Sequence, residues 1–237
     1  MSARSIFRST SRWLAACVGL SAASYLACVG YAWVRYGDVR PATRPEQQDA
    51  LLDRFMPAYE VAERHQIRID APADITFEAA IELDLQQSPI VRAIFKGREW
   101  IMRSHPVRQP ESASFIDQMR SIGWGVLAEE PGREIVMGAV TQPWLADVVF
   151  RPLPPVEFAA FHDPNYVKIV WTLRADPVGP AESVFRTETR AVATDPVARA
   201  KFRRYWSFLS PGIILIRWAS LAPLKADAER RAGGRRA

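Results

Sequence analysis

One face of a long helix is recognisable in the last part of the chain. Apolar residues recur at steps of three and four between positions 202 and 216, which is the spacing of one face of an α-helix. Asp195 is a good N-cap and Pro196 suits the first helical position, so the helix should begin there. A bend is expected midway, at Pro211-Gly212. The apolar face consists of Phe202, Trp206, Leu209, Ile213 and Ile216.

The segments before this helix alternate between polar and apolar residues. Residues 61–69, 167–175 and 183–193 show the alternation of half-buried strands. Residues 125–129 and 134–141 should form a hairpin, because Pro131-Gly132 fits the central positions of a type II turn. Short helices are expected around Phe77 and Phe115. The pattern predicts an α+β domain in which an antiparallel sheet carries the long C-terminal helix.

The first apolar stretch of the chain has no such alternation. The 22 residues from Trp13 to Val34 carry no charge. As a helix they would measure about 33 Å, at ~1.5 Å per residue, which is enough to cross the hydrocarbon core of a bilayer. Aromatic residues near both ends are typical of membrane interfaces. The sequence predicts a single-pass transmembrane anchor. A cleaved signal peptide, which shares the basic start, is the alternative.

The charges are concentrated at the two ends of the chain. The net charge is +5, but residues 1–44 carry six arginines and one aspartate, and residues 225–237 carry five basic and two acidic residues. The part between them is slightly acidic, so we expect no nucleic-acid partner. Basic flanks beside an apolar helix suit phospholipid headgroups, so membrane lipids are expected partners. Three arginines on each side leave open which side of the membrane holds the soluble domain.

These observations divide the chain into five parts. We expect a basic N-terminus, a transmembrane anchor, a polar tether, one folded domain and a basic tail. Their boundaries are 1–12, 13–34, 35–57, 58–231 and 232–237.

Residue types that form common catalytic or metal sites are sparse. Both cysteines, Cys17 and Cys28, lie in the apolar stretch, which excludes a disulfide framework or a cysteine-based zinc site from the folded domain. The three histidines show no metal-ligand spacing, and no G-x-S-x-G, Walker A, dinucleotide or H-E-x-x-H motif occurs. We therefore expect neither a metal nor a cofactor. The oligomeric state stays open.

Four short pieces of the folded part carry a resemblance: residues 65–72, 127–134, 187–190 and 203–206, the last followed by Pro211-Gly212. They resemble an uncharacterised bacterial branch of the START-like, or polyketide cyclase/dehydrase-like (SRPBCC), helix-grip superfamily. The resemblance implies a curved sheet gripping the last helix, with a cavity between them for apolar small molecules or lipids. It implies no shared catalytic set, because such folds hold binders, cyclases and non-enzymes. With the anchor, the expected location is the bacterial cytoplasmic membrane.

The last strand indicates where a ligand would lie. Its Thr187 and Thr189 share a face with small neighbours, and small residues opposite an apolar helix leave room for a ligand. A filled core with locally bonded threonines is the alternative. The expected pocket residues are Phe77, Met137, Trp171, Thr187, Thr189, Phe202 and Trp206.

Charged residues on the strands allow two further hypotheses. His65 lies on the apolar face of the first strand and is a candidate acid, base or polar anchor. A core histidine satisfied by a hydrogen bond is the alternative. Glu188 and Arg190, with Glu134 and Arg186, are expected to form a solvated ion-pair ladder that contributes little stability. If that face turned inward, the same residues would bind an anionic ligand.

Three functions follow from these observations. The favoured one is a membrane-tethered binding module that holds a hydrophobic small molecule or lipid. The second is a cyclase/dehydratase-like enzyme in which His65 moves protons. The third is a structural or interaction domain with a filled core and no ligand. The absence of a catalytic constellation favours the binding module over the enzyme.

Overall fold

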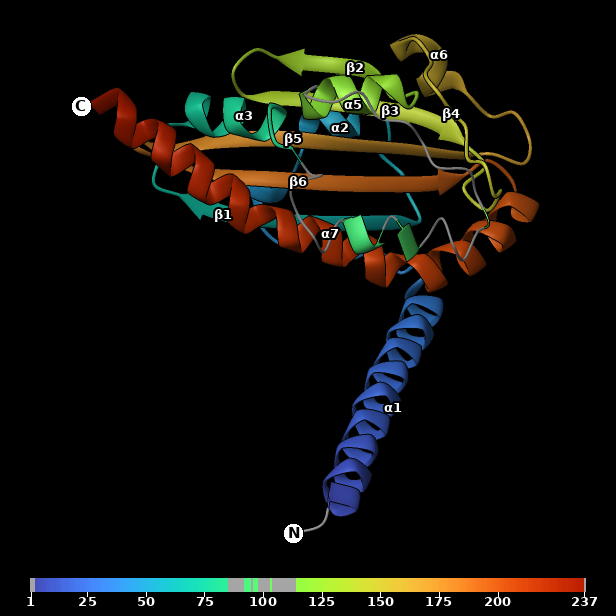
Figure 1. The fold of residues 1–237 in the computed structure, drawn as a ribbon. Coiled ribbons are helices and arrows are strands. Elements are labelled where there is room, and N and C mark those ends of the chain that lie inside the picture. The colour runs from blue at the N-terminus through green and yellow to red at the C-terminus, as the bar shows by residue number, and fades with distance from the viewer. Residues whose placement is uncertain (1–2, 85–91, 95, 98–102, 104–113, 237) are drawn as a thin grey trace.

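The computed structural model contains one antiparallel sheet beneath a long C-terminal helix (Figure 1). It describes residues 3–84, 92–94, 96–97, 103 and 114–236. The strands are β1 (Val61–Ile69), β2 (Gly125–Glu130), β3 (Glu134–Thr141), β4 (Phe150–Arg151), β5 (Val167–Gly179) and β6 (Glu182–Ala193). They are ordered β1-β6-β5-β3-β2, with β4 beside β3, and all pairings are antiparallel.

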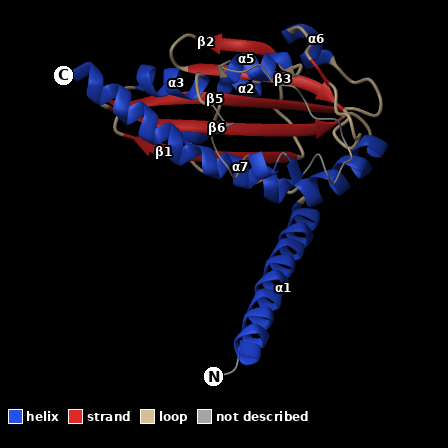
Figure 2. Ribbon diagram, in the orientation of Figure 1, coloured by secondary structure: helices blue, strands red, loops and turns tan. Residues whose placement is uncertain are grey.

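Helices cover both faces of this sheet (Figure 2). The helices are α1 (Ala3–Arg35), η1 (Pro45–Gln47), α2 (Ala50–Asp53), α3 (Ala73–Ile81), α5 (Phe115–Ser121), α6 (Pro155–Ala160) and α7 (Pro196–Arg236). On one face, α3, α5 and α7 pack against the largest apolar cluster. On the other, α2 and α6 cover a separate cluster.

The α+β helix-grip arrangement predicted from the sequence is confirmed. β1 spans the residues expected from the alternation, and β6 ends where it was predicted to end. In the β2–β3 hairpin, Gly132 has a φ of 72°, the positive value that a type II turn requires at its third position. The N–H of Arg133 donates to the carbonyl of Glu130 at 3.0 Å, which closes the turn.

The junction between β6 and α7 also follows the prediction. The carboxylate of Asp195 accepts from the N–H groups of Val197 and Ala198 at 2.7 and 3.0 Å, so it caps the helix. The helix then continues through Pro211 to Arg236 and bends along the sheet (Figure 1).

The N-terminal helix α1 projects from the domain as a stalk (Figure 1). The predicted span at 13–34 is helical, and Trp13 and Leu26 are exposed. Among the helices of the described residues, however, the one long and apolar enough to cross a membrane is α7, over Pro196–Arg235. A core helix can share that length and composition, and α7 does pack on the sheet near both of its ends. The membrane span of α1 stays a prediction.

Part of the segment predicted as a polar tether packs on the domain. Leu52 and Met56 are 0% and 2% exposed and join the apolar cluster of Val136 and Phe158. Asp49 begins α2 by accepting from the N–H of Leu52 at 2.8 Å. Residues 49–56 therefore cover the sheet face that is turned away from α7.

This cover buries the charged face of β6, which we predicted to be solvated. Glu188 and Arg190 are 6% and 3% exposed. Arg190 donates through Nε to Glu188 at 2.8 Å and through Nη1 to the carbonyl of Met56 at 2.9 Å. The prediction was wrong because alternation shows which residues share a face, but not what covers it. This face is turned away from α7, so it does not line the grip.

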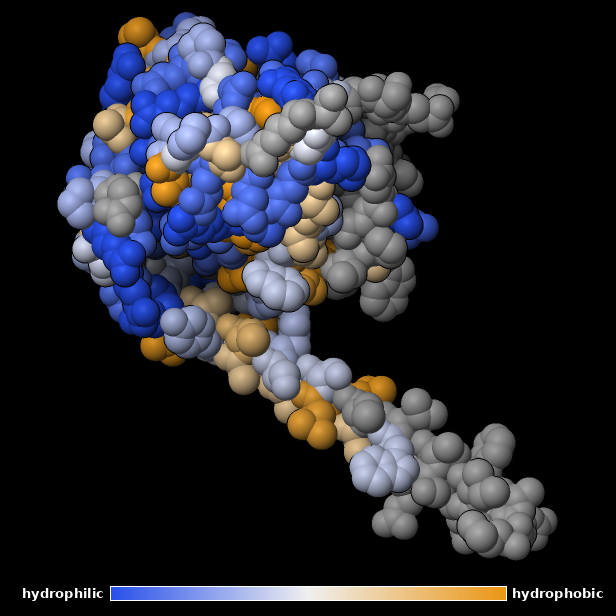
Figure 3. Space-filling view, turned by 90° about the vertical axis from the view of Figure 1, so that its left-hand side faces the viewer, coloured by the Kyte–Doolittle hydropathy of each residue, from blue (hydrophilic) through white to orange (hydrophobic). Residues whose placement is uncertain are grey.

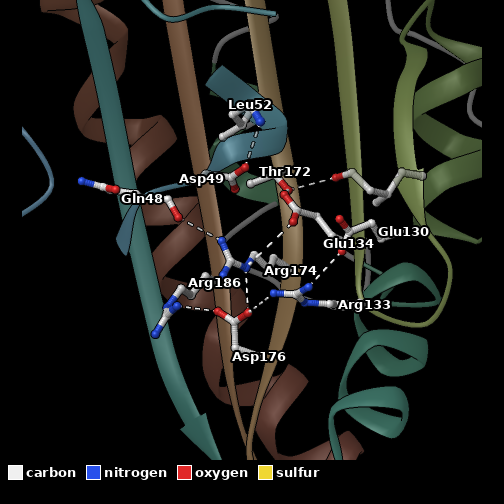
Figure 4. Close-up of polar contacts among 11 residues, drawn as sticks. Gln48, Asp49, Leu52, Glu130, Arg133, Glu134, Thr172, Arg174, Asp176 and Arg186 are labelled. Carbon is white, nitrogen blue, oxygen red and sulfur yellow. Dashed lines mark hydrogen bonds and ion pairs between the residues drawn. The ribbon is translucent and has the colours of Figure 1, made fainter. Parts of the chain in front are cut away.

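Further charges continue across the same face toward β3 (Figure 4). Arg174 lies 2.7 Å from a carboxylate oxygen of Asp176 and donates to the carbonyl of Gln48 at 3.1 Å. The bond to Gln48 fastens the chain before α2 to the sheet.

Glu134 of β3 is the most perturbed acid of this network. It is 3% exposed and accepts from the hydroxyl of Thr172 at 3.0 Å. Burial raises the pKa of Glu134 to about 8, and the charge of Asp49 and a hydrogen bond with it raise this pKa as well. The bond from Thr172 and the charge of Arg174 act in the opposite direction. The folded protein therefore holds the carboxyl of Glu134 in its protonated form at neutral pH.

We predict that Glu134 makes the protein less stable as the pH rises from about 5 to 8. The folded state keeps its proton while the unfolded carboxyl, with a pKa of about 4.3, has lost it, so deprotonation favours unfolding throughout this window. Glu134→Gln stays neutral at every pH and should remove this slope, which is at most about 1.4 kcal/mol per pH unit. Urea unfolding of the full chain in detergent at pH 5, 6.5 and 8 measures it. Glu130→Gln, at an exposed position, is the control; equal slopes in native protein and Glu134→Gln would refute the prediction.

Candidate functional site

Two adjacent rows of cross-strand neighbours lie on the sheet face that meets α7. Residues directly opposite one another in an antiparallel pair share a face, so each row places its side chains under the helix. The row across β1, β6, β5 and β3 is Glu63, Thr189, Trp171 and Met137. The next row is His65, Thr187, Leu173 and Ile135.

Arg217 reaches these rows from α7. Its guanidinium donates from Nη1 to the hydroxyl of Thr187 at 3.0 Å and from Nη2 to the hydroxyl of Thr189. Both partners are neutral. Within the described residues, no carboxylate lies at ion-pair distance from Arg217. Within the described part of the chain, hydroxyl groups are thus the partners that hold this positive charge under the helix.

Burial and nearby charges shift the pKa values of Arg217 and Glu63. Burial lowers the pKa of Arg217 to about 10, and the charge of Glu63 opposes this shift. Burial also raises the pKa of Glu63, while the charges of Arg217 and Arg64 lower it. The two groups attract one another across the site without contact, so the charge of Arg217 is compensated only at a distance.

His65 lies beside the same group, opposite Thr187 in the β1–β6 ladder. Its Nε2 is buried and has no hydrogen-bond partner among the residues that the structure describes. Burial lowers the pKa of His65, and the charge of Arg217 lowers it further. The imidazole is therefore neutral at pH 7 and presents an unused polar atom to the site.

The other predicted pocket residues lie in two apolar clusters on either side of this polar group. Phe77 of α3, Met137 and Trp171 belong to the cluster under the last turns of α7, and all three are buried. Phe202 and Trp206 belong to the cluster under its first turns. Five of the seven predicted residues therefore lie on two sides of the polar group, and the other two, Thr187 and Thr189, belong to it.

The seal between sheet and helix is incomplete along the edge strand β1, between the two clusters, while Thr187 and Thr189 of the neighbouring β6 are buried. Val61 and Ile69, at the ends of β1, are 5% and 0% exposed. Glu63, His65 and Ile67, which lie between them on the same face, are only partly buried. α7 is likewise more exposed in its middle than toward its ends. Its predicted contact residues Leu209, Ile213 and Ile216 are partly exposed, and residues nearer both ends are buried.

Two members of the site, Glu63 and Arg217, were not predicted from the sequence. A signal for Arg217 was available, because it is the one charged residue between Tyr205 and Leu224 and lies four positions after Ile213. A lone cation on the apolar face of a helix has to meet a polar partner inside the protein.

The chemistry available at this site is that of a cationic donor, two hydroxyls, a neutral imidazole and a carboxyl group. These groups suit hydrogen bonding or proton transfer to a bound molecule. Among the described residues, no group of three or more His, Cys, Asp or Glu side chains is placed to hold a metal ion.

Comparison with known proteins gives weak similarities to solved structures. No family model and no curated protein matches the chain. Norcoclaurine synthase of Thalictrum flavum is 10% identical, with a TM-score of 0.31, over 70% of this chain and 94% of that one. CalU16 of Micromonospora echinospora is 12% identical, with a TM-score of 0.24, over 73% and 86%. The Zhui aromatase/cyclase of Streptomyces sp. R1128 is 14% identical, with a TM-score of 0.24, over 72% and 94%.

These TM-scores are all below 0.5, so the fold assignment depends on the strand order and the position of α7 described above. The resemblance to the helix-grip architecture is confirmed on those grounds.

We predict that His65 titrates below the ordinary histidine pKa of about 6.5. Both burial and the charge of Arg217 disfavour its protonated form. In Arg217→Gln the titration should move to higher pH. Two-dimensional NMR of the imidazole signals, recorded on the full chain in micelles between pH 4.5 and 8, measures this. The exposed His162 is the internal control. If the titration of His65 is the same in both proteins, Arg217 does not act on it.

Proposed function

We propose that this chain is a membrane-anchored helix-grip domain that binds a hydrophobic small molecule or lipid between its sheet and α7. The observation that supports this most directly is the incomplete seal under the middle of α7. There, Glu63, His65 and Ile67 remain partly exposed although they lie on the helix-facing side of β1. A domain that only needed a filled core would bury this region as it buries both ends of the helix.

The position of α1 supports a role beside a membrane. The hydroxyl of Tyr25 donates to the carbonyl of Phe208, and Arg203 donates to the carbonyl of Trp33 at 2.9 Å. α1 therefore lies against the first half of α7. If residues 13–34 cross the bilayer, this part of α7 lies at the membrane, with Phe208 beside the middle of the span.

The surface of α7 near this contact is apolar. Phe208, Leu215 and Trp218 are 49%, 43% and 68% exposed. In Figure 3, hydrophobic side chains gather along α1 and at the base of the domain where α1 joins it. Exposed apolar side chains, and aromatic ones above all, are favourable at the interface between lipid and water. The same stretch of α7 is the part that covers the polar site, so a lipid could pass between bilayer and grip without crossing open water.

A cyclase/dehydratase-like enzyme is the second candidate function. Glu63 and His65 converge beside Arg217, which is the arrangement of polar groups that proton transfer needs. The test is to compare the bound compound before and after incubation with native protein and with His65→Asn. Loss of one water from the compound in native protein alone would favour the enzyme.

We predict that Thr189→Trp removes the bound molecule. The larger side chain would stand beside Trp171 in the same cross-strand row and occupy the space under α7. Full-length protein purified in a mild detergent is extracted, and the extract is analysed by mass spectrometry. A hydrophobic compound near one equivalent is expected in the native protein, reduced by about tenfold or more in the variant.

Val178→Trp, at an exposed position near the end of β5, is the matched control and should retain the compound. The proposal fails if no defined compound accompanies the native protein, or if Thr189→Trp retains it with an unchanged melting temperature. Either result would favour a filled core without a ligand.

We also predict that the middle of α7 contacts the bilayer. In a cysteine-free background, spin labels at Trp218→Cys and at Val178→Cys are compared in nanodiscs by electron paramagnetic resonance. The label at 218 should be more accessible to oxygen, which dissolves in lipid, than to a water-soluble nickel chelate, and the label at 178 should show the reverse. Equal accessibilities at the two positions would contradict this location.

A further inference from the structure

The donors at Arg217 are only partly used. A guanidinium carries five N–H donors in a planar fork. Two of its hydrogen bonds go to the hydroxyls of Thr187 and Thr189. The described part of the chain offers no carboxylate in contact with it. Arg217 is half-buried, and placing a cation even partly out of water against neutral partners is costly, because the charge loses part of its hydration without gaining a counter-ion.

The neighbours of Arg217 add donors and few acceptors. Each threonine hydroxyl that accepts from Arg217 still has its own hydrogen to donate. His65 brings a buried Nε2 that has no partner among the described residues, and it donates when that nitrogen carries the proton. Several donors therefore converge on one point under α7, and a group with several lone pairs and a negative charge would complement them.

The surrounding residues limit the size and character of what this point can hold. The cluster with Phe77, Met137 and Trp171 lies on one side of it. Phe202 and Trp206 lie on the other. Only a molecule with a small charged end and an apolar remainder matches a single cation placed between two apolar clusters.

We infer that Arg217 binds the anionic head group, a carboxylate or a phosphate, of an amphipathic ligand whose apolar part lies along the sheet under α7. This inference rests on the proposed function, because it identifies the ligand of the same site. Thr187 and Thr189 hold the guanidinium in place for the head group, and His65 contributes one further hydrogen bond.

Glu63 is the main competing partner for Arg217. It stands on β1 opposite Thr189 and compensates the guanidinium from a distance. An arriving anion would meet repulsion from this carboxylate. Glu63→Gln is therefore expected to strengthen binding of an anionic ligand by about threefold to tenfold. A neutral ligand should bind this variant and the native protein with the same affinity.

The test compares acids with neutral molecules of the same apolar length. Full-length protein in delipidated micelles is titrated with palmitic acid and with hexadecanol, and separately with phosphatidic acid and with diacylglycerol. We expect the acid of at least one pair to bind the native protein about tenfold or more tighter than its neutral counterpart. The pair that shows the preference distinguishes a free carboxylate from a lipid phosphate.

Variants of Arg217 test whether this residue causes the preference for the acid over the neutral molecule. Arg217→Gln should lose the preference for the acid while it binds the neutral molecule within about twofold of the native protein, and Arg217→Lys should restore part of it. Thr189→Val keeps the shape of the side chain and removes its hydroxyl. It should weaken only acid binding, by about threefold or more, and it provides the test if Arg217→Gln does not fold.

Two outcomes would overturn the inference, and they are distinguishable. If acid and neutral molecules bind equally well to the native protein, or if Thr189→Val and Arg217→Gln both keep the preference, Arg217 does not hold the head group although the proposed function stands. If none of the four molecules binds, the inference and its premise, a hydrophobic ligand in the grip, fail together.

Discussion

The hydrogen bonds of Asp195 determine where α7 lies on the sheet. Its carboxylate accepts from the N–H groups of Val197 and Ala198 in the first turn and from that of Asn165 just before β5. The bond from Asn165, together with those of the helix N–H groups, lowers the pKa of Asp195, so the cap stays charged. The end of β6, the start of β5 and the start of α7 meet at this one side chain. Because a helix rises ~1.5 Å per residue, a fixed start also fixes which residues face the sheet roughly 30 Å further along, at Arg217.

Each face of the sheet holds an arginine, buried Arg190 on one and half-buried Arg217 on the other, and the two charges are compensated differently. On the face turned away from α7, Arg190 lies 2.8 Å from Glu188 and 2.5 Å from Asp53. On the face turned toward α7, the contacts of Arg217 in the described residues are the hydroxyls of two threonines. A buried cation with carboxylates in contact belongs to the structure of the domain, and removing a partner would destabilise it. A half-buried cation without carboxylates in contact is the arrangement expected where a ligand supplies the missing charge. This contrast, within one sheet, supports the proposed binding site on the α7 side.

Alternation and capping predicted the sheet, its hairpin and the start of α7, because those features depend on neighbouring residues. What covers each face could not be predicted in this way. Residues 49–56 read as part of a polar tether, yet Leu52 and Met56 are buried against the sheet, and the charges of Glu188 and Arg190 are buried with them. Of the site, the threonines and His65 were predicted from the alternation. Arg217 was missed because only apolar residues were assigned to the face of α7 that meets the sheet. Its significance depends on the threonines it meets, which are about thirty positions away in the sequence.

The middle of α7 differs from its ends in burial. Pro211 and Pro223 have no N–H to donate, so the helix lacks a backbone hydrogen bond at each of these points, but the residues directly after Pro211 on the helix are also only partly buried. Toward the C-terminus, Leu224 is buried and Glu229 accepts from the N–H of Asp70 at 3.0 Å. Toward the N-terminus, Asp195 and Phe202 hold the helix in place. Because the helix is held at both ends and weakened between them, the region near Pro211 can move away from the sheet with the smallest loss of contacts. This stretch lies beside α1. The part of α7 that loses the least packing against the sheet on opening is therefore also the part that would face the membrane.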